Sequence, residues 1–357
     1  MQDLPLRTLH DVAGAILRPE AEWNVPAGYR SLEDEVRAVR TRSGVIDMSD
    51  RAKIELTGSE RVPFLDGLVT ADVKVLAPGT SAYALLLNEK SRVLGDLRVY
   101  AFPGSLVLDI EAAQKTTILG ILEKARVSDD VEFRDLGPTG HLGVHGPRAD
   151  DVVTRALGAE VRGLTLDASV SFPVDKSHAG HVARMRPTGE RGFAIWSPGS
   201  NLAEAWEGLV RAGAMPIGRE AYEVLRIEAG VPRLGVDMGA ETLALEVAPE
   251  STISFTKGCY VGQEIVARGT YVGQVKRKLM GLLVDGDVAP ARKDAVSSGG
   301  REVGFLTSTS WSPTLKQVLA LAILRVDGVS GPGGLAVHHG GREVRAQLSS
   351  LPFVQTT

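Results

Sequence analysis

The sequence has 357 residues, of which 43% are hydrophobic and 24% are charged, and these values predict a soluble protein of two or three globular domains. The net charge of -4 excludes a general electrostatic attraction to nucleic acid or to an anionic membrane. No apolar stretch approaches the roughly 18 residues that cross a bilayer, and the first residues lack the pattern of a signal peptide. We therefore expect a cytoplasmic protein.

Strand-like and helix-like patterns mix in the first part of the chain without a regular β-α-β rhythm and without a glycine-rich phosphate loop. Such mixing favours an α+β fold over a doubly wound sheet. Ser31 is a candidate N-cap for the first helix. The predicted elements are a helix at 31–44, a strand at 51–58, a helix at 60–73, two strands within 82–102 joined by a turn at 88–91, a strand at 105–112 and a helix at 115–126.

A similar set of elements begins at His141 and ends with a predicted helix at 201–213, which weakly indicates an internal pseudo-repeat. After about residue 273 the pattern changes to short apolar strands separated by Gly, Pro and Ser turns. This pattern predicts a small antiparallel barrel or sandwich.

The chain contains a single cysteine, Cys259, in the segment KGCYVGQE. One cysteine excludes an intramolecular disulfide, a multi-cysteine zinc site and an iron–sulfur cluster ligated by this chain alone. His145 and the pair His338-His339 have no partners at metal-ligand spacing, so we expect no metal site. Lys257 and the adjacent glycine favour the thiolate of Cys259, and Gln263 and Glu264 are placed to orient a ligand. The alternative is a buried cysteine that packs as a small hydrophobic residue.

KGCYVGQE, with RIEAGVPRLGVD before it and VAR after it, resembles the signature of the YgfZ family, which binds folate and supports iron–sulfur cluster assembly or repair. The resemblance implies a ring of two α+β segments around a folate-sized central hole, followed by a C-terminal antiparallel β-barrel. It also implies folate contacts from Lys257, Tyr260, Gln263 and Glu264. The corresponding domains are 1–140, 141–273 and 274–357.

Most of the chain also resembles the related T-protein of the glycine cleavage system, an aminomethyltransferase that uses tetrahydrofolate. The stretch VLGDLRVY matches the T-protein segment that carries its catalytic aspartate, here Asp96. Tyr83, Glu190 and Tyr222 are expected to be further folate contacts. Two T-protein ligand contacts are replaced, a pterin-binding glutamate by Ala194 and an arginine for the acidic tail by Tyr222. These losses predict weakened or reoriented folate binding.

The leading hypothesis from the sequence is a folate-binding factor for iron–sulfur cluster assembly or repair, with Cys259 as its functional thiol. Its expected ligands and partners are a reduced folate, a transient iron–sulfur cluster, and client or assembly proteins. The alternative is an aminomethyltransferase that uses Asp96, tetrahydrofolate and a lipoyl carrier protein. A third hypothesis is a scaffold of the same fold that binds another small molecule or a protein.

Overall fold

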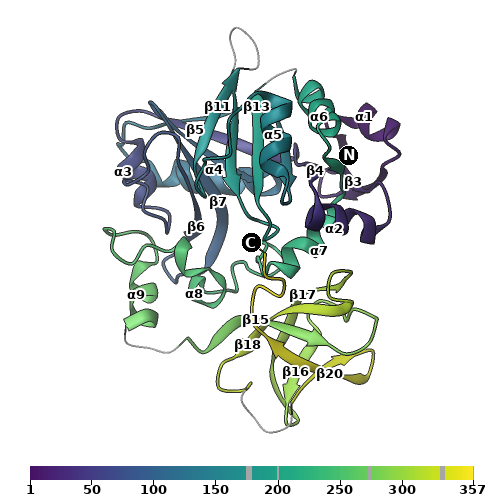
Figure 1. Cartoon of the computed structure of the whole chain (residues 1–357). Helices are drawn as coiled ribbons and strands as arrows, with labels where there is room; N and C mark the ends of the chain where they lie inside the picture. The colour runs from purple at the N-terminus through teal and green to yellow at the C-terminus, as the bar shows by residue number, and fades with distance from the viewer. Residues whose placement is uncertain (174–178, 199–200, 272–274, 330–333, 357) are drawn as a thin grey trace.

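Two α+β segments and a C-terminal barrel make up the fold of this computed structural model, with a short N-terminal sheet beside the α+β segments (Figure 1). The structure describes residues 1–173, 179–198, 201–271, 275–329 and 334–356. The barrel lies below the two segments in Figure 1, and the C-terminus returns to the junction between them.

The first α+β segment is a five-stranded antiparallel sheet with two helices on one face, in the strand order β6-β7-β8-β5-β9. Alternate strand residues such as Ile54, Leu97 and Leu108 are buried against these helices, as period-two patterning requires. The elements are β5 (Arg51–Thr57), α3 (Arg61–Asp66), β6 (Ser81–Leu87), β7 (Val93–Phe102), β8 (Ser105–Glu111), a 3-10 turn (Ala112–Gln114), α4 (Lys115–Ala125) and β9 (Glu132–Asp135).

The second segment is a six-stranded sheet in the order β11-β12-β13-β10-β4-β14. Without β4, the strands of the second segment have the same order along the chain and the same order in the sheet as those of the first segment. The topology therefore contains the pseudo-repeat that the sequence indicated weakly. The elements are β4 (Gly44–Asp47), β10 (Thr139–His145), α5 (Ala149–Leu157), β11 (Ser169–Pro173), β12 (Ala179–Met185), β13 (Gly192–Pro198), α6 (Leu202–Arg211) and β14 (Met215–Pro216).

Helix α2 (Leu32–Thr41) packs on helix α7 (Arg219–Glu228) through Val36, Val39 and Val224. Ser31 caps α2 as predicted, because its hydroxyl accepts a hydrogen bond from the Asp34 amide at 3.2 Å. The N-terminal elements before α2 were not predicted: β1 (Gln2–Asp3), α1 (Arg7–Val12), β2 (Ile16–Glu20) and β3 (Trp23–Gly28).

The two large sheets meet at a small aromatic contact. Tyr100 and Val107 of the first segment pack against Ala183 and Trp196 of the second, and the rings of Tyr100 and Trp196 lie 5.7 Å apart. This contact holds the segments together at one place while a cavity remains between them elsewhere.

The C-terminal part forms a closed antiparallel barrel in the order β15-β18-β17-β16-β19-β20, which decides between the barrel and sandwich alternatives. Leu319 and Leu321 pack on Ile227 and attach the barrel to helix α7. The strands are β15 (Arg277–Val284), β16 (Ala295–Ser298), β17 (Arg301–Ser312), β18 (Gln317–Arg325), β19 (Leu335–His339) and β20 (Arg342–Ser349); α8 (Ala244–Val247), a 3-10 turn (Glu250–Thr252) and α9 (Gln263–Tyr271) precede them.

The predicted fold class is confirmed, but one predicted helix is too long. The segment 60–73 is helical only to Asp66, because the Asp66 carboxylate accepts a hydrogen bond from the Val73 amide at 2.9 Å and turns the chain back. The domain limits 1–140, 141–273 and 274–357 remain a prediction, and the last boundary falls outside the described residues.

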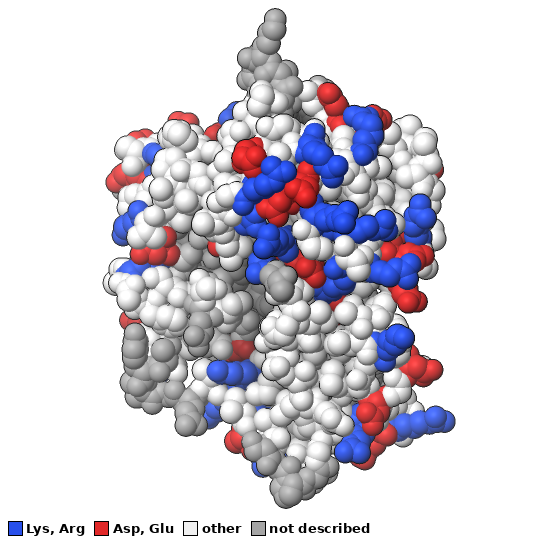
Figure 2. Space-filling view, in the orientation of Figure 1, with Lys and Arg blue, Asp and Glu red and all other residues white. Residues whose placement is uncertain are grey.

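The distribution of surface charge and the character of the helices can be compared with the expectations from composition about nucleic acid and membranes. On the face shown in Figure 2, acidic and basic side chains are interspersed over the α+β segments, and much of the barrel front is uncharged. None of the helices among the described residues combines the length and the apolar character needed to cross a membrane.

Candidate functional site

A cavity of about 680 Å³ lies between the two α+β segments and the N-terminal sheet. Its walls come from the inner face of the first sheet, from α7 and the loop after it, and from residues of β2 and β3. Among the described residues that line it, none belongs to the barrel. Pockets of a few hundred cubic ångströms that combine apolar walls with a few polar groups are typical small-molecule sites.

The first sheet supplies charged side chains to this cavity because its strands alternate charged and apolar residues. Tyr83, Arg98 and Asp109 line the cavity and lie opposite one another across β6, β7 and β8, and the buried Lys53 continues this row on β5. Their neighbours on the opposite face are apolar and belong to the core. A sheet face this rich in charge, placed against other parts of the protein, is suited to bind a polar ligand.

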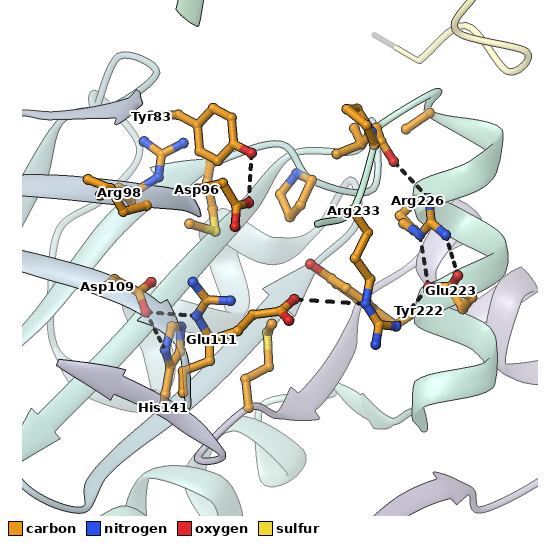
Figure 3. A pocket seen from close by; sticks show the side chains of 18 of the residues that line it. Tyr83, Asp96, Arg98, Asp109, Glu111, His141, Tyr222, Glu223, Arg226 and Arg233 are labelled. Atoms are coloured by element: carbon orange, nitrogen blue, oxygen red, sulfur yellow. Dashed lines mark hydrogen bonds and ion pairs between the residues drawn. The ribbon is translucent and has the colours of Figure 1, made fainter. Parts of the chain in front are cut away.

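Asp96 projects from the centre of β7 into the cavity (Figure 3). Its carboxylate accepts a hydrogen bond of 2.7 Å from the hydroxyl of Tyr83 and a longer one of 3.4 Å from the amide of Gln114. Burial, and then the charge of Asp96, raise the pKa of Tyr83 well above its usual value. Tyr83 therefore remains a neutral hydrogen-bond donor that orients the carboxylate.

Asp109 is the centre of a buried cluster beneath this site. It accepts hydrogen bonds from Arg51 Nε at 2.7 Å and from Lys53 Nζ at 2.9 Å, and Lys53 also contacts His141 Nδ1 at 3.0 Å. Burial would raise the pKa of Asp109, but the charges of Arg51 and Lys53 outweigh it and lower that pKa. Burial and the nearby lysine lower the pKa of His141 far below its usual value, so this imidazole is neutral.

Helix α7 forms the opposite wall, because its residues 219, 222, 223 and 226 share one face at i, i+3, i+4 and i+7 spacing. The ring of Tyr222 lies 5.7 Å from that of the buried His145. Arg226 donates to Asp237 and to Ser308 of the barrel, both at 2.7 Å, and also pairs with Glu223. Arg226 is thus engaged by protein groups.

Arg233 lies between the two walls (Figure 3). It donates a hydrogen bond of 2.9 Å to Glu20 of β2 and forms longer ion pairs with Glu223 of α7 at 3.5 Å and Glu111 of β8 at 3.8 Å. One arginine therefore joins the N-terminal sheet, the first segment and helix α7 around the cavity.

The structure brings together only some of the residues that the sequence proposed as ligand contacts. Asp96, Tyr83 and Tyr222 line the cavity. Glu190 does not, because its carboxylate pairs with Arg40 at 2.8 Å in a buried contact with α2. Ala194 is fully buried in β13.

The KGCYVGQE segment lies outside the set of residues that line the cavity. The ammonium of Lys257 donates to the backbone carbonyls of Asp66, Val69 and Ala71 at 2.6 to 2.7 Å, so it holds a loop of the first segment. The thiol of Cys259 is exposed at the surface. Residues 254–262 contain neither helix nor strand, which agrees with the prediction that Cys259 does not lie in a core strand.

The rest of this motif also makes packing contacts. Tyr260 is buried in an apolar cluster, and burial raises its pKa to about 12. Gly262 has a positive φ, and a side chain there would meet the Asn88 carbonyl oxygen at 2.7 Å. Gln263 and Glu264 begin α9 and do not line the cavity. Among the described residues, no group of His, Cys, Asp and Glu is arranged to hold a metal ion.

Several residues that line the cavity were not predicted from the sequence, notably Arg51, Asp109, Glu111 and His141. For Arg51, Asp109 and Glu111 the signal was present as charged residues at every second position of otherwise apolar strands, in RAKIEL and in VLDIE. A strand of an antiparallel sheet with one face in water shows the same pattern, so the pattern identifies a cavity only when the part of the protein that faces it is known.

Known protein families match this chain in two parts that correspond to the α+β segments and to the barrel. The family model for the GCVT N-terminal domain matches residues 6–257, and that for the glycine cleavage T-protein C-terminal barrel domain matches residues 277–355. The aminomethyltransferase of Aquifex aeolicus (strain VF5) is 31% identical over 99% of this chain and 95% of its own length. That of Synechococcus sp. (strain RCC307) is 33% identical over 99% of both chains.

The crystal structure of the glycine cleavage system aminomethyltransferase T from Bartonella henselae superposes with a TM-score of 0.89. The superposition covers 99% of this chain and 98% of that one at 24% sequence identity, which shows a common fold.

These relatives correct the leading hypothesis from the sequence. The prediction of an iron–sulfur assembly or repair factor with Cys259 as its functional thiol is wrong, because the full-length curated relatives are aminomethyltransferases. The placement in the wider superfamily was right, and the narrower assignment to the YgfZ family is not supported. The short motif around the cysteine was given more weight than the resemblance along the rest of the chain.

Proposed function

This chain belongs to the glycine cleavage T-protein family, and from that membership we propose that it is a tetrahydrofolate-dependent aminomethyltransferase. The observation that carries the proposal is the position of Asp96, the residue that resembles the catalytic aspartate, on the wall of the central cavity. In the proposed reaction, an aminomethyl group bound to the lipoyl arm of a carrier protein gives its carbon to tetrahydrofolate and releases ammonia.

The reaction requires proton transfer close to the folate nitrogens. The carbon leaves sulfur and the amine and becomes bonded to two folate nitrogens, while the two protons lost by these nitrogens go to the thiol and to ammonia. A carboxylate held beside the accepting nitrogen can orient its N–H and relay a proton, which contributes about 10²- to 10⁴-fold to a rate. Tyr83 fixes Asp96 for this role through the 2.7 Å hydrogen bond.

The charged walls favour a ligand with both a polar ring and an acidic tail. T-protein has its arginine for the acidic tail at the position of Tyr222. In this chain, Arg219 lines the cavity one helical turn before that position. Arg219 pairs with Asp50, and its buried Nε has no hydrogen-bond partner in the described part of the chain. We assign Arg219 to the folate carboxylates and the Tyr222 ring to stacking contact with the ligand.

The test is ammonia release by the purified protein with aminomethylated lipoyl carrier protein and tetrahydrofolate. We expect ammonia release that requires both reactants, since the carbon needs a donor and an acceptor. A mixture that lacks either reactant, and the carrier without its lipoyl group, serve as controls. Ammonia release no faster than in the enzyme-free mixture would contradict the proposed function.

A further inference from the structure

Glu111 and Arg51 face each other on the cavity wall. They are directly opposite in the antiparallel pairing of β5 with β8, which places their Cβ atoms about 5 Å apart. Both line the cavity, and the exposed fractions of their side chains are 36% and 20%. Despite this proximity, no hydrogen bond joins them among the described residues.

Arg51 is held rigidly from one side only. Its Nε donates to Asp109 at 2.7 Å, and Asp109 is itself fixed by the buried Lys53. A guanidinium has five N–H donors, and no hydrogen bond from its two terminal nitrogens reaches another described residue. These nitrogens are therefore available to an acceptor atom of a ligand.

Glu111 is a carboxylate without a strong protein partner. Its closest cation is Arg233, at 3.8 Å, which is too long for a hydrogen bond. Burial raises the pKa of Glu111, although Arg51 and Arg233 partly offset this effect. A hydrogen-bond donor from a ligand would stabilise this half-buried carboxylate, because no hydrogen bond from the described residues compensates for its partial desolvation.

A fixed donor beside an acceptor is complementary to one kind of ring edge. A guanidinium recognises a carbonyl oxygen, and a carboxylate recognises N–H groups. We propose that Arg51 and Glu111 together recognise a lactam edge, a ring carbonyl next to a ring N–H, on the heterocycle bound in the cavity. The inference rests on the proposed function, and it adds that the 4-oxo pyrimidine ring of the folate is read by this pair.

The test compares the dissociation constants of two reduced folates, tetrahydrofolate and its 4-amino analogue, in which an amino group replaces the ring carbonyl. We expect the wild type to prefer the 4-oxo compound by about 10-fold or more, the size of one charge-assisted hydrogen bond. Arg51→Met should reduce this preference to less than about 3-fold, because the ring carbonyl loses its hydrogen bond from the guanidinium. Glu111→Gln should weaken binding of the 4-oxo compound by about 10-fold.

Glu55→Gln is the matched control. Glu55 lies on β5 with the same inward alternation as Arg51, but it pairs with Arg134 and does not line the cavity. This variant should keep both affinities. If Arg51→Met fails to fold, Glu111→Gln, which is nearly isosteric, still tests the pair.

The possible failures are distinguishable. Ammonia release by the wild type, together with an unchanged 4-oxo preference in both variants, would contradict the lactam-edge inference and leave the proposed function intact. Failure of the wild type to bind either compound would contradict both.

Discussion

The cavity wall and the KGCYVGQE segment both contain charged and reactive side chains, but they use them differently. At the cavity, Asp96 and Glu111 face open space, and much of their hydrogen-bonding capacity is not used by the protein. In the motif, Lys257 is fully occupied by backbone carbonyls, and Cys259 lies at the surface away from the cavity. A distinctive motif such as KGCYVGQE therefore does not by itself identify a ligand site. Polar groups inside a cavity that lack protein hydrogen-bond partners are a better guide.

The largest expected effect on stability is in the motif. Lys257→Met leaves three carbonyls and Asp66 without their buried cation, so it should reduce the free energy of unfolding by about 3 kcal/mol. Urea unfolding measures this loss. Lys74→Met is the control, since Lys74 also pairs with Asp66 but is 56% exposed, and its removal should cost less than about 1 kcal/mol. Equal losses in the two variants would contradict a structural role for Lys257.

Tyr83→Phe tests the cavity wall, where polar side chains are proposed to act on the ligand. Losing the hydrogen bond to Asp96 should lower kcat by about 10-fold while KM changes little, because the carboxylate is present but poorly oriented. Steady-state ammonia release measures both constants. A rise in KM with unchanged kcat would instead indicate that Tyr83 binds the ground state of the ligand.

Acid should affect the cavity region through buried histidines. Burial lowers the pKa of His145, beside Tyr222, from 6.5 to about 4. Because the folded pKa is the lower one, the unfolded chain takes up the proton first. The contribution of His145 to stability is therefore complete above pH 6.5 and is lost as the pH falls towards 4.

His145→Leu should flatten this pH dependence by roughly 1 kcal/mol per pH unit between those limits. Denaturant unfolding across this pH range provides the measurement. The slope is the readout, so a change in the overall stability of the variant does not affect the conclusion. An unchanged slope would mean that His145 is not buried in its neutral form.

The smallest effect is expected at the cysteine. Cys259→Ser changes an exposed side chain, so the free energy of unfolding should change by less than about 0.5 kcal/mol. Thermal and denaturant unfolding of the variant measure the change. A loss several times larger would mean that the thiol packs against another part of the protein.

Much of the fold followed from local patterns in the sequence. The alternation in RAKIELTG and the cap at Ser31 correctly predicted β5 and α2, and the glycine-rich turns predicted an all-β C-terminal part. The helix predicted after Glu60 was too long because the bond from the Val73 amide to Asp66 is a local contact that overrides periodicity.

The site was only partly predictable, for a different physical reason. Asp96, Tyr83 and Tyr222 were proposed from a resemblance and do line the cavity, but their roles as ligand contacts remain to be tested. Arg51 and Glu111 come from strands distant in sequence, and nothing local distinguishes them from surface charges. The contacts of Lys257 could not be predicted from the sequence because its carbonyl partners lie about two hundred residues earlier in the chain.

The most direct test of the account is to measure ammonia release from aminomethylated carrier protein and tetrahydrofolate with the wild type, Asp96→Asn and Cys259→Ser side by side. We expect Asp96→Asn to lower kcat by about 10²-fold or more, because the amide cannot transfer a proton as the carboxylate does. Cys259→Ser should retain the wild-type rate. Loss of ammonia release in Cys259→Ser, with full activity in Asp96→Asn, would contradict the assignment of the chemistry to the central cavity.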